Sequence, residues 1–378
     1  MFEIVNAPRH YPWGSLTAFA ELRGVTPSGK PEAEIWFGDH PGSPSVRVSD
    51  GLNLIEWEAL DATREPLPFL LKLLAVDIPL SLQVHPSLAA ARAGFERENT
   101  AEIPIDSPSR NYKDANHKPE IIRAVTTFSA LSGFRPQLER NDIVAYLQGA
   151  GVDGADGLAQ ALASGLRDAV DGIIRHEPFA GELAAALADH VATTGVEHVD
   201  DAVNTARAIA ATFPGDPGLA LVLLLNHIVL QPGEALAVPA GTVHAYLSGV
   251  GVEVMASSDN VLRAGLTTKH VDADEFLAVV DFDAAASGRI TPRVSENVRE
   301  LSATFPDCIL TEITVDGAGS LPISTPAIAL VIDGTVSVGA NEDTKLTPGG
   351  AVFLESTDSD FRFSGSGTLV VAHGISSR

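Results

Sequence analysis

Short apolar runs separated by turn residues fill the first 136 positions of the chain. Residues 66–76 (PLPFLLKLLAV), which begin with proline, and 79–86 (PLSLQVHP), which begin and end with proline, are two examples. Apolar runs of this length between turn-forming residues are typical of β-strands. We therefore expect residues 1–136 to fold mainly as strands joined by turns.

A different pattern occupies residues 137–213, which are rich in alanine and poor in proline. Leu183, Leu187 and Val191 recur every four positions, the spacing of one helix face. The segment ends in FPGDPG at residues 213–218, whose glycines and prolines disfavour further helix. The pattern predicts a small helical unit inserted into a β protein.

Strand-like patterns return from Leu219, and the chain from about Leu301 to its end reads as all-β. In residues 327–340 (AIALVIDGTVSVGA), Asp333-Gly334 separates two alternating apolar stretches, which predicts a β-hairpin.

Two proline-glycine turns precede similar strands, in PGEALAVP from Pro232 and in PGGAVFLE from Pro348. The first continues into AGTVHAY, whereas the second continues into STDSDF and has no histidine. A duplicated β-barrel would give this pattern if one copy had functional side chains in its pocket and the other had none. Turns of this kind are, however, common before strands.

The length of 378 residues predicts two or three domains, and 45% hydrophobic with 20% charged residues argues against disorder. A net charge of −24 disfavours nucleic acid and anionic membranes as partners. An anionic small ligand would need a local basic pocket. The lone Cys308 excludes a disulfide framework and a cysteine-based zinc site. With no apolar run near the ~20 residues of a membrane span, and no basic-then-apolar start typical of a signal peptide, we expect a cytoplasmic protein.

The strand predicted around residues 81–85 carries the most informative polar face. Residues two apart in a strand share a face, so Ser81, Gln83 and His85 point one way. An ordinary edge strand would show the same alternation. If this face lines a barrel interior instead, Gln83 and His85 are placed to hold a cation together.

Two further segments supply potential ligands. In NHKPE, His117, Lys118 and Glu120 precede a strand-like run, and zinc accepts imidazole nitrogen and carboxylate oxygen. A charged surface loop would have the same sequence pattern. In VPAGTVHAY, His244 and Tyr246 share one strand face, although a lone histidine there is more often structural.

A fourth segment, residues 253–269, combines Glu253, Arg263 and Lys269. On so acidic a chain, the two cations are suited to hold a phosphate or an enediolate. Salt bridges to the many carboxylates are the alternative.

Together these segments closely resemble the type I phosphomannose isomerases of the cupin superfamily. The matching text, in order over roughly residues 11–272, is YPWGS, EIWFGDHP, LSLQVHP, NHKPE, ALSGFRP, LQPGEALAVPAGTVHAYLSG and VEVMASSDNVLRAGLTTKHVD. Two departures from the family pattern are Thr268, where proline is frequent, and Ala237, where a bulkier residue is frequent.

The resemblance implies a mainly β fold with an α insertion: two cupin-like (jelly-roll) β-barrels plus a small helical domain. The corresponding ranges are 1–136 and 215–300 for the two parts of the catalytic domain, 137–214 for the helical insertion, and 301–378 for a C-terminal domain without a metal site. It also implies one Zn²⁺ per chain. The implied zinc ligands are Gln83, His85, Glu120 and His244, and the implied pocket residues are Lys118, Glu253, Arg263, Lys269, Tyr246, Ser81 and Trp13.

The implied reaction interconverts mannose 6-phosphate and fructose 6-phosphate by moving a proton between C2 and C1. Glu253 is our first choice as base, with Lys118 and His117 as alternatives. We assign Arg263 to the enediolate charge and Lys269 to orienting the substrate or its phosphate.

Two other functions fit a cupin. One is an iron-dependent oxygenase, against which a neutral fourth ligand argues mildly. The other is a sugar-binding protein without activity, against which the retained acidic and basic pocket residues argue. For the isomerase, we expect a small sugar phosphate as partner and a monomer or weak homo-oligomer.

Overall fold

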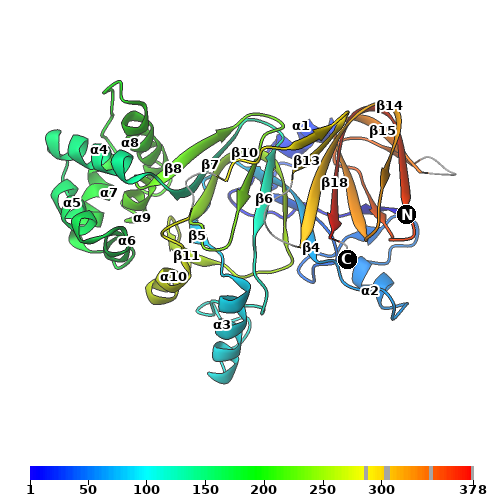
Figure 1. The fold of residues 1–378 in the computed structure, drawn as a ribbon, viewed down its shortest axis with the longest axis horizontal. Coiled ribbons are helices and arrows are strands. Elements are labelled where there is room, and N and C mark those ends of the chain that lie inside the picture. Colours follow the sequence, from blue (N-terminus) through cyan, green and yellow to red (C-terminus); the bar gives the residue numbers. More distant parts are fainter. Residues whose placement is uncertain (285–287, 302–306, 340–343, 376–378) are drawn as a thin grey trace.

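The computed structural model describes residues 1–284, 288–301, 307–339 and 344–375 (Figure 1). A helical unit lies at one end of the long axis, a first sheet lies in the middle, and a second sheet lies at the other end. No helix in these residues is long and apolar enough to span a membrane.

The first sheet is built around β10 (His244–Ala256), a 13-residue strand with partners along both edges. Its first half pairs with β5 and β7, and its second half pairs with β4 and β6, all antiparallel. This arrangement brings segments more than a hundred residues apart in sequence onto one surface. The other strands of this sheet are β2 (Glu34–Phe37), β4 (Phe69–Val76), β5 (Leu82–Val84), β6 (Glu120–Ala124), β7 (Phe128–Phe134), β8 (Leu225–Leu230), β9 (Ala235–Val238) and β11 (Leu262–Gly265).

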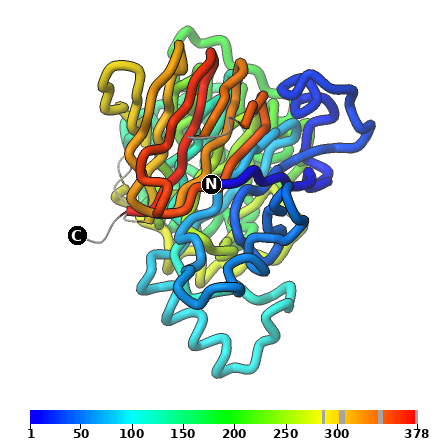
Figure 2. The backbone as a smooth tube through the Cα atoms, turned by 90° about the vertical axis from the view of Figure 1, so that its right-hand side faces the viewer, coloured from blue at the N-terminus to red at the C-terminus, as the bar shows by residue number. Residues whose placement is uncertain are grey.

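The second sheet joins the C-terminal strands to the N-terminus. β1 pairs with β17 (Phe2 opposite Phe353) and with β3, so the first strand of the chain completes a sheet made mostly of the last strands (Figure 2). Local sequence patterns did not anticipate this pairing. The strands are β1 (Phe2–Val5), β3 (Val46–Arg47), β12 (Arg293–Ser295), β13 (Val298–Leu301), β14 (Cys308–Pro322), β15 (Ala327–Val338), β16 (Thr344–Leu346), β17 (Ala351–Leu354) and β18 (Asp360–Gly374).

Helices replace strands over residues 137–213, as the alanine-rich pattern predicts. Leu183 and Leu187 are fully buried, but α7 ends at Leu187, so Val191 lies outside it and is half exposed. The unit comprises α4 (Gln137–Gly149), α5 (Ala155–Ser164), α6 (Leu166–Ile174), α7 (Pro178–Leu187), α8 (Glu197–Ala210) and α9 (Gly218–Val222). Elsewhere lie α1 (Ala18–Arg23), α2 (Leu54–Glu58), α3 (Leu88–Thr100) and α10 (Ala273–Val279).

Two local predictions are wrong. The run after Leu219 begins as helix α9 and becomes strand only at Leu225, because a short run buried on all sides lacks the period that separates helix from strand. Asp333-Gly334 does not form a hairpin. It lies within the continuous strand β15, where the register to β18 shifts between Val331 and Asp333 and Gly334 has φ +76°.

A mainly β fold with a helical insertion is thus confirmed. The strand pairings within the described residues form open sheets, so the two jelly-roll barrels stay a prediction. Both proline-glycine turns precede a strand, β9 and β17, and both Gly233 and Gly349 have φ near +86°, at +87° and +85°. The apolar faces of the two sheets meet in one cluster that includes Phe69 and Leu71 from β4 and Ile328 and Leu330 from β15.

Candidate metal site and pocket

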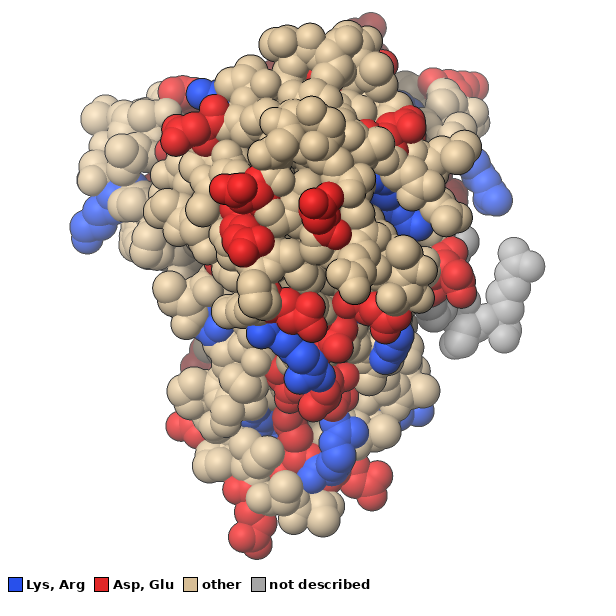
Figure 3. Space-filling model, turned by 90° about the vertical axis from the view of Figure 1, so that its left-hand side faces the viewer, with Lys and Arg blue, Asp and Glu red and all other residues tan. Residues whose placement is uncertain are grey.

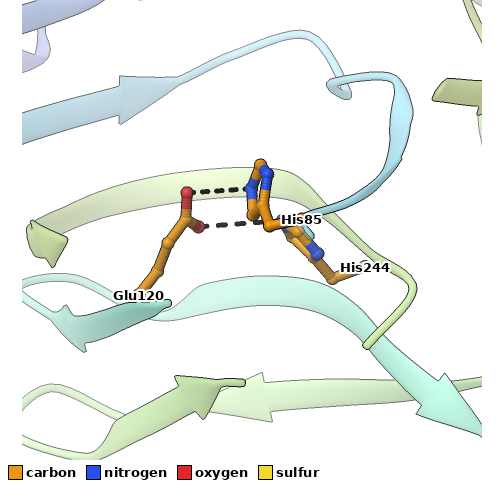
Figure 4. A group of neighbouring side chains, drawn as sticks. All are labelled: His85, Glu120 and His244. Carbon is orange, nitrogen blue, oxygen red and sulfur yellow. Dashed lines mark ion pairs between the residues drawn. The ribbon is translucent and has the colours of Figure 1, made fainter. Parts of the chain in front are cut away.

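Three buried side chains converge inside the first sheet: His85, Glu120 and His244 (Figure 4). His85 follows β5, Glu120 begins β6 and His244 begins β10. The Nε2 atom of His85 lies 3.1 Å from Oε1 of Glu120, and Nε2 of His244 lies 3.7 Å from Oε2. Their potential ligand atoms all lie within 4.8 Å of one another, close enough to hold one ion.

Backbone carbonyls orient both imidazoles. The Nδ1 atom of His85 lies 2.7 Å from the oxygen of Asn260, and that of His244 lies 3.0 Å from the oxygen of Thr242. A carbonyl can only accept, so Nδ1 carries the proton and donates in each case. Each Nε2 therefore presents a lone pair toward Glu120, the tautomer that a metal-binding histidine needs.

The protonation states of His85, Glu120 and His244 favour the binding of a cation. Burial lowers the pKa of His85 to about 3 and lowers the pKa of His244, which keeps both rings neutral. Burial alone would raise the pKa of Glu120, but Lys118 and His85 outweigh it and hold that pKa well below its usual value. Two neutral imidazoles and one carboxylate are ligands that Zn²⁺ accepts, so these residues fit the expected ion.

Lys118, Tyr246 and Gln83 surround the three ligands. The ammonium of Lys118 contacts Oε1 of Glu120, and the hydroxyl of Tyr246 donates to Oε2 across 2.9 Å. Gln83 is paired with His244 in the strand register and donates from Nε2 to Oγ of Ser81 at 3.1 Å. The alternation predicted for residues 81–85 thus places a polar face against the cluster.

A pocket of about 620 Å³ opens onto the cluster. Ten of the twelve residues singled out from the sequence line it, whereas His85 and His117 are not among its lining residues. The imidazole of His117 pairs with Asp307 at 2.9 Å. The ten are Trp13, Ser81, Gln83, Lys118, Glu120, His244, Tyr246, Glu253, Arg263 and Lys269.

Sequence reasoning missed Lys72, which lies beside Glu253 in the pocket wall. Its Nζ lies 3.1 Å from Oε2 of Glu253 and 3.9 Å from Oε1 of Glu34, whose other oxygen accepts from Nε1 of Trp36 at 2.7 Å. Burial would lower the pKa of Lys72, but Glu34 and Glu253 raise it instead. The available signal was a lysine inside the apolar run of β4, because a buried charge needs a partner.

Glu253 itself is buried, and its surroundings shift its pKa in opposing directions. Burial raises its pKa to about 7, Lys72 acts in the lowering direction, and Glu120 adds to the increase. A carboxyl group poised near neutrality can both accept and release a proton at physiological pH.

Arg263 and Lys269 also line the pocket, and neither forms an ion pair with a described carboxylate. Arg263, on β11, is paired with Gln83 in the register, and its Nε is buried without a hydrogen-bond partner among the described residues. Burial lowers the pKa of both cations, and Arg263 further lowers that of Lys269. Two close cations without carboxylate partners are suited to bind an anion.

Comparisons with known proteins place these features in context. A model of the phosphomannose isomerase type I catalytic domain matches residues 1–137. Mannose-6-phosphate isomerase of Salmonella typhimurium is 35% identical over 98% of both chains, and that of Escherichia coli is 36% identical over the same shares. The human enzyme of this name is 29% identical over 95% of this chain and 94% of its own.

Solved structures agree in fold. A crystal structure of a variant phosphomannose isomerase from Salmonella typhimurium superimposes with a TM-score of 0.89, at 33% identity and over 100% of both chains. A mannose 6-phosphate isomerase bound with zinc and yttrium has the same TM-score, identity and coverage.

Proposed function

The chain belongs to the type I mannose-6-phosphate isomerases, and we propose that it interconverts D-mannose 6-phosphate and D-fructose 6-phosphate with one zinc ion per chain. The observation that carries this proposal is the buried His85–Glu120–His244 cluster, which shares a pocket with an acid–base candidate and with two cations that form no ion pair with a described carboxylate. The named relatives are isomerases, which favours this reaction over an iron oxygenase or a sugar-binding protein.

His85, Glu120 and His244 would hold the zinc ion, with the amide oxygen of Gln83 as fourth ligand. The hydrogen bond from Nε2 of Gln83 to Ser81 supports this role, because it leaves the amide oxygen available. One anionic ligand leaves the site with a net charge of +1. When bound, the ion supplies a Lewis acid that polarises a sugar oxygen next to the proton to be removed.

Glu253 would move the proton between C2 and C1. Its burial excludes water that would compete for the carboxylate, and its pKa near 7 suits a group that must accept and return one proton. The charge of Lys72 holds the pKa of Glu253 below the value that burial alone would give it. Lys118 and His117 stay alternative proton carriers, although His117 pairs with Asp307 and is not among the residues that line the pocket.

Arg263 and Lys269 would bind negative charge on the substrate. We assign Arg263 to the oxygen that becomes negative as the proton leaves, and Lys269 to orienting the substrate or its phosphate. Trp13, Ser81 and Tyr246 line the same pocket and would contact the sugar. Opening of the sugar ring precedes these steps and has no assigned residue.

The domain assignment also stands as a proposal. We propose one catalytic cupin domain from residues 1–136 and 215–300, a helical insertion at 137–214, and a C-terminal cupin-like domain at 301–378 that shares its sheet with the N-terminal strand β1. Acidic groups are prominent on the face that the helical unit presents, with basic groups interleaved below (Figure 3). With the net charge of −24, this disfavours nucleic acid and anionic membranes as partners. We also propose that the enzyme is cytoplasmic and monomeric or weakly oligomeric.

The test is conversion of mannose 6-phosphate to fructose 6-phosphate by the purified chain, before and after chelation and after return of zinc. We expect activity that chelation removes and zinc restores. A folded, zinc-loaded chain without conversion would contradict the assignment.

A further inference from the structure

A second cluster of reactive side chains lies outside the pocket described above, where α8 packs on the first sheet (Figure 1). Ser129 is on β7, His227 on β8 and Asp201 on α8. Oγ of Ser129 lies 2.8 Å from Nε2 of His227, and Nδ1 of the same ring lies 2.6 Å from Oδ1 of Asp201. Hydroxyl, imidazole and carboxylate thus form a continuous hydrogen-bonded chain.

The sheet separates this cluster from the metal site. Ala130 and Tyr246 pack in the cluster of apolar side chains beneath the metal pocket, whereas Leu131 and Leu247 pack against the helical unit. Because side chains alternate along a strand, Ser129 shares the face of Leu131. The serine therefore faces the helical unit, away from the metal ligands.

Asp201 determines which nitrogen of His227 carries the proton in this hydrogen-bonded series. Its second oxygen, Oδ2, accepts from Nη2 of Arg135 at 2.6 Å. Burial would raise the pKa of Asp201, but hydrogen bonds from His227 and Arg135 outweigh it and lower the pKa. An ionised Asp201 accepts the Nδ1 proton of His227, so that Nε2 is left to accept from Ser129, the arrangement that makes a serine nucleophilic.

A separate pocket of about 650 Å³ gives access to the serine. Pro79, Ile209 and Leu247 contribute apolar wall, while Glu197 and Asp200 line its α8 side together with Asp201. Ser248 also lines this pocket and is paired with Ser129 in the strand register, so both side chains lie on one face. The lining suits a small ligand with an apolar part and a neutral or positive charge.

We propose that Ser129, His227 and Asp201 form a second, metal-independent active site that hydrolyses small neutral or cationic esters. Oγ of Ser129 bonds to the acyl carbon as its proton passes to Nε2 of His227, and the ester C–O bond breaks as that proton passes to the leaving alcohol. Water then attacks the acyl-serine, giving its proton to His227. Release of the carboxylic acid returns that proton to Ser129. The hydroxyl of Ser248 is placed to donate to the carbonyl oxygen as it becomes negative.

The test uses the zinc-loaded full chain and two probes. A fluorophosphonate reports an activated serine, with the labelled peptide located by mass spectrometry, and p-nitrophenyl acetate reports turnover. We expect label on Ser129 and ester turnover, both lost in Ser129→Ala and both reduced 10²–10⁴-fold in His227→Gln, the usual contribution of a general base. Chelation, and the substitution Glu253→Gln, should leave both unchanged. Relative to its own uncatalysed hydrolysis, the anionic ester 4-acetoxybenzoate should be accelerated less than p-nitrophenyl acetate.

A matched control is His198→Ala, which removes a histidine on α8 that is paired with an aspartate, Asp142, at 3.0 Å but without a serine. It should leave labelling and turnover unchanged. Isomerase activity reports folding of the Ser129, His227 and His198 variants, because these three residues lie outside the isomerase pocket. Absence of label on Ser129, equal labelling in the His227→Gln variant, or turnover that survives Ser129→Ala would each overturn the proposal, whatever the isomerase assay shows.

Discussion

Lys72 and Glu253 are register partners in the adjacent strands β4 and β10, and their charged atoms lie 3.1 Å apart inside the protein. Both side chains are buried, at 6% and 4% exposure. The ion pair is therefore held by two long antiparallel strands rather than by a loop. This rigidity fixes the carboxylate that we propose as the base.

Replacing Lys72 by methionine should raise the pKa of Glu253. In the native chain Lys72 favours the ionised carboxylate, so its loss disfavours that form. Because the base must be ionised, the acidic limb of the kcat/KM profile should move to higher pH by roughly one unit or more, equivalent to about 1.4 kcal/mol per unit. Steady-state rates between pH 5 and 9 measure this, and Lys72→Arg, which keeps the charge, should move the limb less. An unshifted limb in Lys72→Met would contradict the role of Glu253 as base.

Glu253→Gln should lower turnover by roughly 10²–10⁴-fold, because an amide cannot accept the C–H proton. The cluster of His85, Glu120 and His244 is unchanged by this substitution, so zinc content should equal that of the parent. Turnover and metal analysis on one preparation check both statements. Near-normal turnover would remove Glu253 as base and favour Lys118.

The period of two along residues 81–85 correctly predicted a polar strand face, and ordered motifs identified the family. Neither could show from pattern alone that His85, Glu120 and His244 meet, because their contact depends on which strands pair with β10. Lys72 escaped notice for a related reason: its partners Glu34 and Glu253 come from strands distant in sequence. Only the three-dimensional register reveals that its charge is compensated.

Local rules failed where tertiary packing decided the outcome. The apolar run after Leu219 is enclosed by the helical unit. A short run that is buried on all sides can form either a helix or a strand. Asp333-Gly334 has the composition of a tight turn, but β15 continues through it because β18 offers a partner strand along nearly the whole length. The pairing of β1 with β17 joins the two ends of the chain, which no window of sequence can report.

His85→Ala should lose zinc and activity together. The substitution removes one of three clustered ligands and leaves Glu120 and His244 unable to bind the ion tightly. Metal analysis after dialysis, alongside turnover, is the measurement. His190→Ala, which removes an imidazole hydrogen-bonded to Tyr146 in the helical unit, should retain both. A fully active His85→Ala variant with bound zinc would overturn the ligand assignment.

Glu58 provides a stability test remote from the pocket. Burial and the nearby Asp39 raise the pKa of Glu58 to about 8. A carboxyl group whose pKa is raised in the folded state stabilises that state fully when the pH is below the pKa of the unfolded state, near 4.5. This stabilisation is lost as the pH rises through 8. Glu58→Gln should therefore unfold at a higher temperature than the parent at pH 9, with a smaller difference at pH 6. Thermal melts of this variant and of the exposed control Glu65→Gln test it, and equal pH dependence of parent and Glu58→Gln would contradict it.

Close packing of Gly218 on Gly265 links the helical unit to the loop between Arg263 and Lys269. A Cβ atom on Gly218 would lie 3.1 Å from Cα of Gly265 and 2.9 Å from Oδ1 of Asp216, closer than ordinary contacts. Asp216 also holds this loop through the backbone N–H of Thr267, at 3.3 Å. Gly218→Ala should therefore displace the end of β11 and the loop that carries Lys269.

We expect Gly218→Ala to raise KM for mannose 6-phosphate by about tenfold, equivalent to about 1.4 kcal/mol of lost substrate binding, with zinc content unchanged. Gly181→Ala is the matched control, because Gly181 lies on the exposed face of α7 and a Cβ atom there meets nothing within 4 Å. That control should leave KM unchanged and stabilise the helix slightly. Because the metal ligands lie on other strands, a rise in KM without loss of zinc locates phosphate recognition in the loop after β11. An unchanged KM in Gly218→Ala would show that the helical unit does not position Lys269.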